Sequence, residues 1–538
     1  MRSTFHGLET GRRALFTQQT ALHTTGHNIA NANTAGFSRQ RVNFSQTEAF
    51  PKPGLNMPGI PGQLGTGVKA GAIQRIREGF LDTQFRAETS KFGYWDSRQV
   101  ALRKMEDVMN EPTEDGLAKT LDRFWSSLQD LSVHPEDSGA RSVVRQRGMA
   151  LAETFNYTAD SLKAVQRDMK EQINVTLNEV NSLARQINNL NKQIASVEPH
   201  GYLPNDLYDQ RDLLVDRLSQ IANVKVERVG SGGQSLEIAE GKYTVKLIDD
   251  NGRDMGVTLV DGRRLEANEM RVAFHEGTGL VEHVYVASAN ALKDPNFDYK
   301  TSGGVNIFDV DTFRAVGKLK ADLEAYGYVK MNNGLLEQKG LYPEMLRNLD
   351  QMVFTFVQQF NAVHSAGWNL TDIASGVHSP VDFFDFGSLV PSDGNFQGAA
   401  SSLRVSDKIM SHLDNIAASK GINGEAFSGD GSNALLLANV KDANLDFGGT
   451  TTNVMSFYQG VIGDMAVNTN EAERMTRNSD TLRLSVDQRR ESVSGVSLDE
   501  EMTNLIQFQH AYNAAARTIT MVDEMLDKII NGMGLVGR

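Results

Sequence analysis

Two histidines near the start of the chain have a spacing that suits a metal site. His23 and His27 are four residues apart, which places both imidazoles on one face of a helix. The zinc-protease motif requires a glutamate directly after the first histidine, and Thr24 stands there instead. No third ligand lies nearby in the sequence. We therefore interpret this face as a solvated or assembly-facing helix surface and predict no metal site.

Three other candidates for chemistry have structural explanations. The stretch Gly62–Gly67 resembles a phosphate-binding loop, but Val68-Lys69 follows it where a P-loop carries lysine and then serine or threonine. His364 ends a helical run and has no evident acid or nucleophile partner in the sequence. Ser497 followed by Glu500 is typical of a capping box that opens a helix, and acids in a first turn suit the helix dipole. The sequence therefore predicts no catalytic residue and no cofactor.

The composition excludes several classes of protein. The 538 residues include no cysteine, so disulfides, thiol nucleophiles and cysteine-zinc sites are impossible. A formal net charge of −13 argues against a nucleic-acid partner. No apolar run reaches the roughly 18 residues of a membrane span, so no membrane partner is expected. The first residues lack the apolar core of a signal peptide, so we expect no cleavable secretion signal.

Both ends of the chain carry long apolar repeats. Residues 4–33 predict an amphipathic helix with a heptad stripe of Leu8, Leu15, Leu22 and Ile29. The C-terminal stripe alternates between +4 and +3 spacing, which is typical of a coiled-coil seam. Its members are Leu505, Phe508, Tyr512, Ala515, Ile519, Val522, Leu526 and Ile529. A seam at the end of a chain must pair with the start of the same chain or with another copy.

The charges of the two ends favour this pairing. Residues 1–50 hold five basic and two acidic side chains, whereas residues 491–538 hold three basic and seven acidic ones. Exposed ion pairs contribute only about 0–1 kcal/mol each. We therefore expect burial of the apolar seams to supply most of the stability of the pair.

Between the ends, helical and strand patterns occur in blocks. Helical periodicity is found at 80–110, 114–131, 138–197, 205–221, 313–330, 340–365 and 432–531. Short alternating runs with turn signals such as Asn251-Gly252 predict an antiparallel β domain at 223–310. A cluster of proline and glycine at 50–67 predicts a loop or extended arm.

These blocks predict an elongated α+β multidomain protein. The chain is expected to run out along helices, form β-rich structure, and return along helices, so that its ends meet as a coiled-coil-like core. Four domains are predicted: a terminal helical assembly domain (1–45 with 495–538), a helical body (46–222, 311–369 and 431–494), a β-rich domain (223–310) and a small mixed insertion (370–430).

The segment that follows the first helix resembles a family signature. Residues 28–40 read Asn-Ile-Ala-Asn-Ala-Asn-Thr-Ala-Gly-Phe-Ser-Arg-Gln and are similar to the motif of the bacterial flagellar axial proteins, the rod, hook and hook-associated subunits. The match is carried by Asn28, Ala30, Asn31, Asn33, Thr34, Gly36, Phe37, Ser38 and Arg39. Further family-like segments follow in order at 65–84, 205–212, 317–320, 360–367, 429–435 and 497–512. The Ser-Arg-Gln ending resembles the hook-associated members.

This resemblance implies a structural subunit between hook and filament that polymerises through its terminal helices as a ring or helical homo-oligomer. The implied partners are further copies of the chain, the hook protein, a second junction protein next to the filament, and a flagellar export chaperone at the C-terminal helix. The resemblance also implies export through the flagellar type III apparatus to an extracellular location. Two alternatives remain: a rod or hook subunit, and a hydrolase on an axial scaffold with a cleft in residues 223–430.

Overall fold

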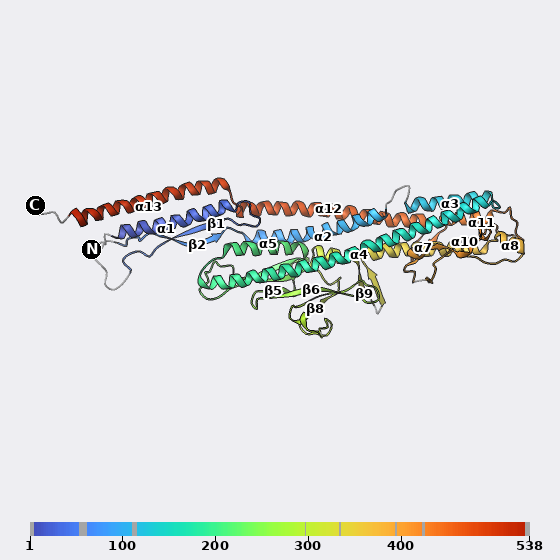
Figure 1. The fold of residues 1–538 in the computed structure, drawn as a ribbon, viewed down its shortest axis with the longest axis horizontal. Helices are drawn as coiled ribbons and strands as arrows, with labels where there is room; N and C mark the ends of the chain where they lie inside the picture. The colour runs from blue at the N-terminus through green and yellow to red at the C-terminus, as the bar shows by residue number, and fades with distance from the viewer. Residues whose placement is uncertain are drawn as a thin grey trace, which may run out of the picture.

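The computed structural model describes residues 5–52, 62–109, 116–295, 297–332, 335–392, 395–421 and 425–532. Within these ranges the molecule is elongated, and both ends of the chain lie at one pole (Figure 1). Long helices run along the molecule and an antiparallel sheet lies on one side, so the predicted α+β multidomain fold is confirmed. Most of the predicted proline/glycine arm, residues 53–61, lies outside the described residues, as do 1–4, 114–115 and 533–538. No described helix is long and apolar enough to cross a membrane.

The pole that holds both ends is a rod of two antiparallel helices with a β-hairpin beside them. Helices α1 (His6–Ala30) and α13 (Leu498–Gly532) pack along each other. Strands β1 (Gln40–Gln46) and β2 (Val68–Arg75) pair antiparallel and contact α1. We call α1, β1, β2 and α13 the terminal rod.

Long helices form the body next to the terminal rod. The 60-residue α4 (Ser138–Val197) and α5 (Asn205–Ile221) have the predicted bounds, and α2 (Gly79–Met109) packs along α12 (Val454–Ser494). The side chain of Asp137 accepts hydrogen bonds from the backbone N–H groups of Gly139 and Ala140 and so caps the start of α4. At 1.5 Å per residue, α4 spans about 90 Å. It therefore connects the body near the terminal rod with the far end of the molecule.

One large sheet packs against α4. Its strands follow the order β10-β9-β7-β6-β5-β4-β3, with β8 paired to β7. All pairs are antiparallel except β7 with β9. The strands are β3 (Val224–Val229), β4 (Lys242–Ile248), β5 (Asp254–Asp261), β6 (Glu266–Phe274), β7 (Val281–Ser288), β8 (Asn306–Phe308), β9 (Tyr328–Asn332) and β10 (Leu335–Lys339).

The sheet extends beyond the predicted β-rich range of 223–310. Strands β9 and β10 follow α6 (Lys318–Tyr326), where the sequence predicted a helix through residue 330. Gly327 ends that helix because its φ of 109° lies outside the range that other residues readily adopt. A Cβ at Gly327 would also lie 2.2 Å from Pro343. This glycine turns the chain back into the sheet.

The far end of the molecule packs around an aromatic cluster. Helices α3 (Leu117–Val133) and α7 (Leu341–Ala366) meet α4 there, and Phe124, Phe356, Phe360, Phe383 and Phe384 are all fully buried. Phe383 and Phe384 come from the predicted insertion 370–430, which therefore shares the core of the body. The small elements that follow α7 are α8 (Leu370–Ser375), β11 (Phe384–Asp385), α9 (Ala399–Ser402), β12 (Arg404–Val405), α10 (Asp407–Ser411), α11 (Ser432–Ala438), β13 (Leu445–Asp446) and β14 (Thr451–Thr452), with 3-10 turns at Leu413–Asn415 and Asn439–Asp442. Further 3-10 turns lie elsewhere, at Glu198–His200 after α4 and at Ala291–Lys293 after β7.

His364 belongs to this core. Its ring is buried, with Nδ1 2.7 Å from the carbonyl oxygen of Val381, and its Nε2 accepts a hydrogen bond from the backbone N–H of Ala417 at 3.0 Å. The neutral ring therefore joins α7 to two loops. Burial lowers the pKa of His364 to about 4.

The lowered pKa of His364 predicts that the far end of the molecule becomes less stable in acid. In the unfolded chain the pKa of a histidine is about 6.5, so the unfolded state takes up a proton at pH values where the folded state does not. The stability that the neutral His364 ring contributes is complete above about pH 6.5. This contribution is lost as the pH falls toward 4, by roughly 3 kcal/mol in total. Urea unfolding followed by tryptophan fluorescence should show this loss in the parent and a flatter profile in His364→Gln. Parallel profiles would contradict the prediction.

Candidate assembly interface

The terminal rod depends on a close approach between α1 and α13. A Cβ added at Gly11 would lie 2.9 Å from Cγ1 of Ile519, and one added at Gly7 would lie 3.2 Å from Cγ2 of Val522. These two glycines, four residues apart, lie on one face of α1 and allow the α13 side chains to approach its backbone. The most buried residues of α1 are Gly11, Thr17, Ala21, Thr24, Thr25 and Asn28. A face of small and polar residues is therefore the most buried part of α1.

The predicted apolar stripes of α1 and α13 are only partly buried. On α13, Ala515 is buried and Leu505, Phe508, Tyr512, Ile519, Val522 and Leu526 are half-buried, whereas Ile529 is exposed. On α1, the heptad residues Leu8, Leu15, Leu22 and Ile29 are only half-buried. Sequence reasoning missed the buried face beside them, although the Gly7 and Gly11 spacing was a visible signal of close helix contact.

The first residue of the motif joins α1 to the strand that follows it. The Asn28 side chain donates to the carbonyl oxygen of Gln40 at 2.8 Å and accepts from the Gln40 N–H at 3.0 Å. It also donates to Glu501 at 3.1 Å. Asn28 is buried, so these bonds are shielded from water. One amide side chain thus connects α1, β1 and α13.

The middle of the motif forms the turn after α1. Ala30 ends the helix, and Asn31 donates from its side chain to the His27 carbonyl and accepts from Thr34. Asn33 and Thr34 are exposed. Gly36 has a φ of 80°, and a Cβ there would lie 3.2 Å from Leu213 on α5.

The end of the motif holds the terminal rod to the body. Phe37 packs edge-on against His27, and the Ser38 N–H donates to Asp209 on α5 at 3.0 Å. The Arg39 N–H donates to the carbonyl oxygen of Ser494, the last residue of α12, at 2.8 Å. The motif therefore contacts two body helices, α5 near its start and α12 at its end.

Arg39 also joins the segment after α1 to the start of α13. Its guanidinium donates to the buried carboxylate of Glu501 at 2.7 Å and to Glu500. The predicted capping box gave Glu500 a role within its own helix, but here its carboxylate binds Arg39 across the rod. The expected attraction between the basic N-terminal end and the acidic C-terminal end is thus present in a specific contact.

We call the contacts of Asn28, Arg39 and Glu501 the joint. Next to this joint lies a buried network of arginines and carboxylates. Arg75 on β2 donates to Asp209 at 2.6 Å, to Asp212 at 2.9 Å and to Glu240 at 2.6 Å. The network continues through Arg77 with Asp82, Arg86 with Asp212 and Asp216, and Arg490 with Asp216. It connects β2, α2, α5 and α12.

The network stabilises the charges of Asp212 and Arg75, whereas burial raises the pKa of Asp209. Burial raises the pKa of Asp212, but the guanidiniums of Arg77, Arg75 and Arg86 outweigh it and hold this pKa well below its usual range. Burial likewise lowers the pKa of Arg75, and the neighbouring carboxylates more than reverse that shift. The sequence carried one signal for this cluster: Asp209, Asp212 and Asp216 share one face of α5.

The two histidines of the predicted helix face have different surroundings. His23 is exposed, while Nε2 of His27 lies 3.3 Å from Asp206 on α5. Among the described residues, no three histidine or acidic side chains gather closely enough to hold a metal ion. His27 instead contributes to the joint between α1 and the body.

Comparison with known proteins places this architecture in a family. Residues 102–379, more than half of the chain, match the family model of the flagellar hook-associated protein FlgK helical domain. The chain is 43% identical to flagellar hook-associated protein 1 of Bacillus subtilis (strain 168), over 100% of both proteins. The chain belongs to the flagellar hook-associated protein 1 family. Its Escherichia coli (strain K12) relative is 24% identical over 95% of this chain and 97% of that protein.

Other matches agree with membership of the hook-associated protein 1 family. The fold is similar to that of the flagellar hook junction protein FlgK from Burkholderia pseudomallei, with a TM-score of 0.59, 14% identity, and coverage of 77% of this chain and 100% of that one. Residues 8–37 match the flagella basal body rod protein family, and 488–532 match the flagellar basal body rod FlgEFG protein C-terminal family. The chain is therefore a structural component of the flagellum, and the prediction of a non-enzymatic protein is confirmed by this membership.

Changing Gly11 tests the close approach within the rod. Gly11→Leu should destabilise the α1–α13 pair by about 1–3 kcal/mol, because the new side chain overlaps Ile519. Gly26→Leu is the matched control, since a Cβ there meets nothing within 4 Å. Hydrogen exchange of α13 amides should accelerate in the first variant only. Equal exchange in both variants would show that the approach does not hold the rod together.

Removing Glu501 tests the joint. Glu501→Ala leaves Asn28 and Arg39 without their buried acceptor and should cost about 2 kcal/mol or more. Glu500→Ala removes an exposed carboxylate and should cost less than about 1 kcal/mol. Limited proteolysis of the terminal rod should therefore be faster in Glu501→Ala than in Glu500→Ala. The reverse order of rates would exclude the assigned role.

Proposed function

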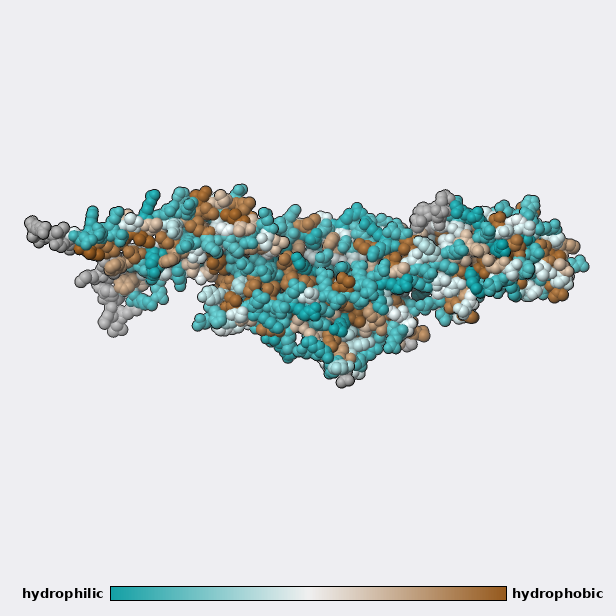
Figure 2. Space-filling view, viewed as in Figure 1, coloured by the Kyte–Doolittle hydropathy of each residue, from teal (hydrophilic) through white to brown (hydrophobic). Residues whose placement is uncertain are grey.

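We propose that this protein forms the junction between the flagellar hook and filament and polymerises through its terminal rod. One observation carries the proposal. After α13 has paired with α1, it still exposes Leu498, Met502, Ile506, Met521 and Met525, each about half accessible to water. Figure 2 shows apolar surface gathered over the rod. An exposed apolar surface of this kind marks a protein-interaction site.

The proposed partners follow from this surface and from the family. Further copies of the chain, the hook protein and a second junction protein next to the filament would cover the rod in the assembled, extracellular structure. Before assembly the same α13 face is an aggregation hazard, so we propose that an export chaperone covers the C-terminal helix. The predicted assembly residues of α1 and α13, and the motif 28–39, serve in this proposal to build and orient the rod.

We also propose that the predicted terminal domain of 1–45 and 495–538, together with β2, is the assembly unit. The rest of the predicted helical body (46–222, 311–369 and 431–494), the β-rich domain with β9 and β10, and the insertion 370–430 that shares the core of the body would lie outside it. Short matches to rod and hook families cover only the two ends, whereas the hook-associated helical domain covers 102–379. This difference favours the junction over a rod or hook subunit.

Charges on the open face of α13 test the proposal. Met502→Asp with Met521→Asp should abolish assembly, because unpaired charges in an apolar interface cost several kcal/mol. Both positions face away from the α1 contact, so the rod itself should remain folded by circular dichroism. Cells with this variant should carry hooks and shed filaments, as seen by electron microscopy.

The control is Val175→Asp on α4, an exposed apolar residue that lies outside the rod. Cells with this control should keep their filaments. If the double variant on α13 also keeps its filaments, assembly does not use this face and the proposal fails.

A further inference from the structure

The open face of α13 is the part of the described chain where exposed methionines gather. Met502, Met521 and Met525 are each about half accessible to water, and Met521 lies one helical turn before Met525. The other exposed methionines among the described residues are Met331 on β9 and Met410 on α10. Methionine is unbranched and flexible, which suits an apolar surface that must adapt to a partner. Its sulfur also makes the same surface open to oxidation.

The methionines in the core of the body are shielded from solvent. Met169 and Met270 have no exposed surface, and Met352 is also buried. The chain has no cysteine, so thioethers are its only sulfur groups. A mild peroxide therefore meets oxidisable sulfur mainly at the exposed positions and leaves the core intact.

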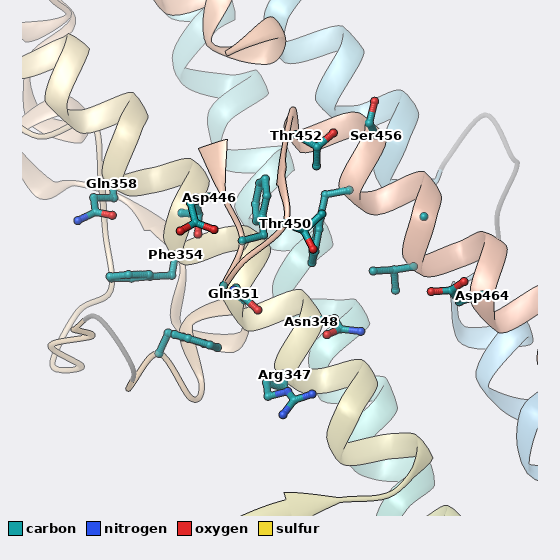
Figure 3. Close-up of a pocket in the computed structure, with 17 residues that line it drawn as sticks. Arg347, Asn348, Gln351, Phe354, Gln358, Asp446, Thr450, Thr452, Ser456 and Asp464 are labelled. Carbon is teal, nitrogen blue, oxygen red and sulfur yellow. The ribbon is translucent and has the colours of Figure 1, made fainter. Parts of the chain in front are cut away.

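The apolar groove of the body offers no such target. This groove has a volume of about 950 Å³ and lies between α7 and α12 (Figure 3). Phe354, Phe396, Phe447 and Phe457 line it together with polar side chains, and its described lining residues include no methionine. Oxidation by peroxide would therefore change the surface of the terminal rod and not that of the groove.

The reaction at each exposed thioether is the transfer of one oxygen atom from hydrogen peroxide. The sulfur lone pair attacks one peroxide oxygen, a sulfur–oxygen bond forms, and the oxygen–oxygen bond breaks. The departing hydroxide takes the proton of the transferred hydroxyl group and leaves as water. Sulfur is thereby oxidised by two electrons to the sulfoxide, and peroxide is reduced. Methionine sulfoxide reductases remove this oxygen again as water, while two thiols are oxidised to a disulfide.

The sulfoxide has different consequences in the free and the assembled protein. In the free protein the new oxygen faces water and hydrogen-bonds to it, so the terminal rod should remain folded. In an assembled structure the same oxygen would be buried in an apolar interface. Burying a polar group without a hydrogen-bond partner is unfavourable. Oxidation therefore opposes assembly, and a methionine that a partner already covers is shielded from peroxide.

We propose that Met502, Met521 and Met525 form an oxidation-sensitive site, at which peroxide blocks the assembly of free subunits and spares subunits that are already assembled. The inference rests on the proposed function, because it takes the open face of α13 as the assembly surface. It adds a chemical control of that surface: an oxidised subunit stays folded but is kept out of the structure.

Binding to isolated hooks tests the oxidation-sensitive site. Hooks are prepared from cells that lack this protein, and the full-length protein is added either untreated or after mild treatment with hydrogen peroxide. Peroxide should reduce the amount of protein that sediments with the hooks by about tenfold or more. The circular dichroism of the free protein should stay unchanged. Treatment of the oxidised protein with methionine sulfoxide reductases should restore binding.

Leucine variants locate the sulfur atoms that matter. The triple variant Met502→Leu, Met521→Leu, Met525→Leu keeps apolar side chains on the face but has no thioether there, so its binding should be the same before and after peroxide. The comparison is made within each variant, so any effect of leucine on binding itself cancels. Met331→Leu is the control, because Met331 is 66% exposed but lies outside the rod. Its binding should fall after peroxide as far as that of the parent.

Mass spectrometry gives a second measurement that needs no variant. The three methionines of α13 should gain oxygen several-fold more slowly in isolated hook–filament structures than in the free protein, because a partner covers them there. This comparison also decides the matter if the triple leucine variant does not bind hooks.

The outcomes separate this inference from the proposed function. Undiminished binding of the oxidised parent, a loss that the reductases do not reverse, or a loss in the triple leucine variant after peroxide would each overturn the oxidation-sensitive site. Equal oxidation rates in free and assembled protein would overturn it as well. Untreated parent that fails to bind hooks would instead overturn the junction role itself.

Discussion

The structure depends on one joint where buried charges meet both ends of the chain. Glu501 at the start of α13 binds Asn28 and Arg39, and the N–H of Ser38 binds Asp209 within the arginine–carboxylate network of the body. Taking these charges out of water is costly, and the cost is offset only when every partner is in place. The joint therefore favours one arrangement of the terminal rod on the body and disfavours partial ones.

The terminal rod has two faces with different uses. Inside, Gly7 and Gly11 let α13 approach the backbone of α1, so a narrow contact of small residues holds the helices together. Outside, α13 keeps an apolar surface that the described residues do not cover. Contacts within one subunit therefore hold the rod to the body, and α13 has apolar surface left to bury in an assembly.

The body supplies the length of the molecule. The long α4 carries the sheet on one side and reaches the aromatic core at the far end, and α2 and α12 run along the body beside it.

The sequence by itself determined most of the long helices, the pairing of the two ends and the family motif, but it wrongly predicted helix at 328–330 and 439–453, where the structure has strands and turns. Helices 138–197 and 205–221 were predicted with their observed bounds, because helical periodicity and caps are local signals. Only the tertiary structure decided that Glu500 binds Arg39, that Arg75 joins Asp209 and Asp212, and that β9 and β10 extend the sheet. These contacts join residues that are tens to hundreds of positions apart. Such pairings depend on how whole elements pack, and they leave no periodic pattern in the sequence.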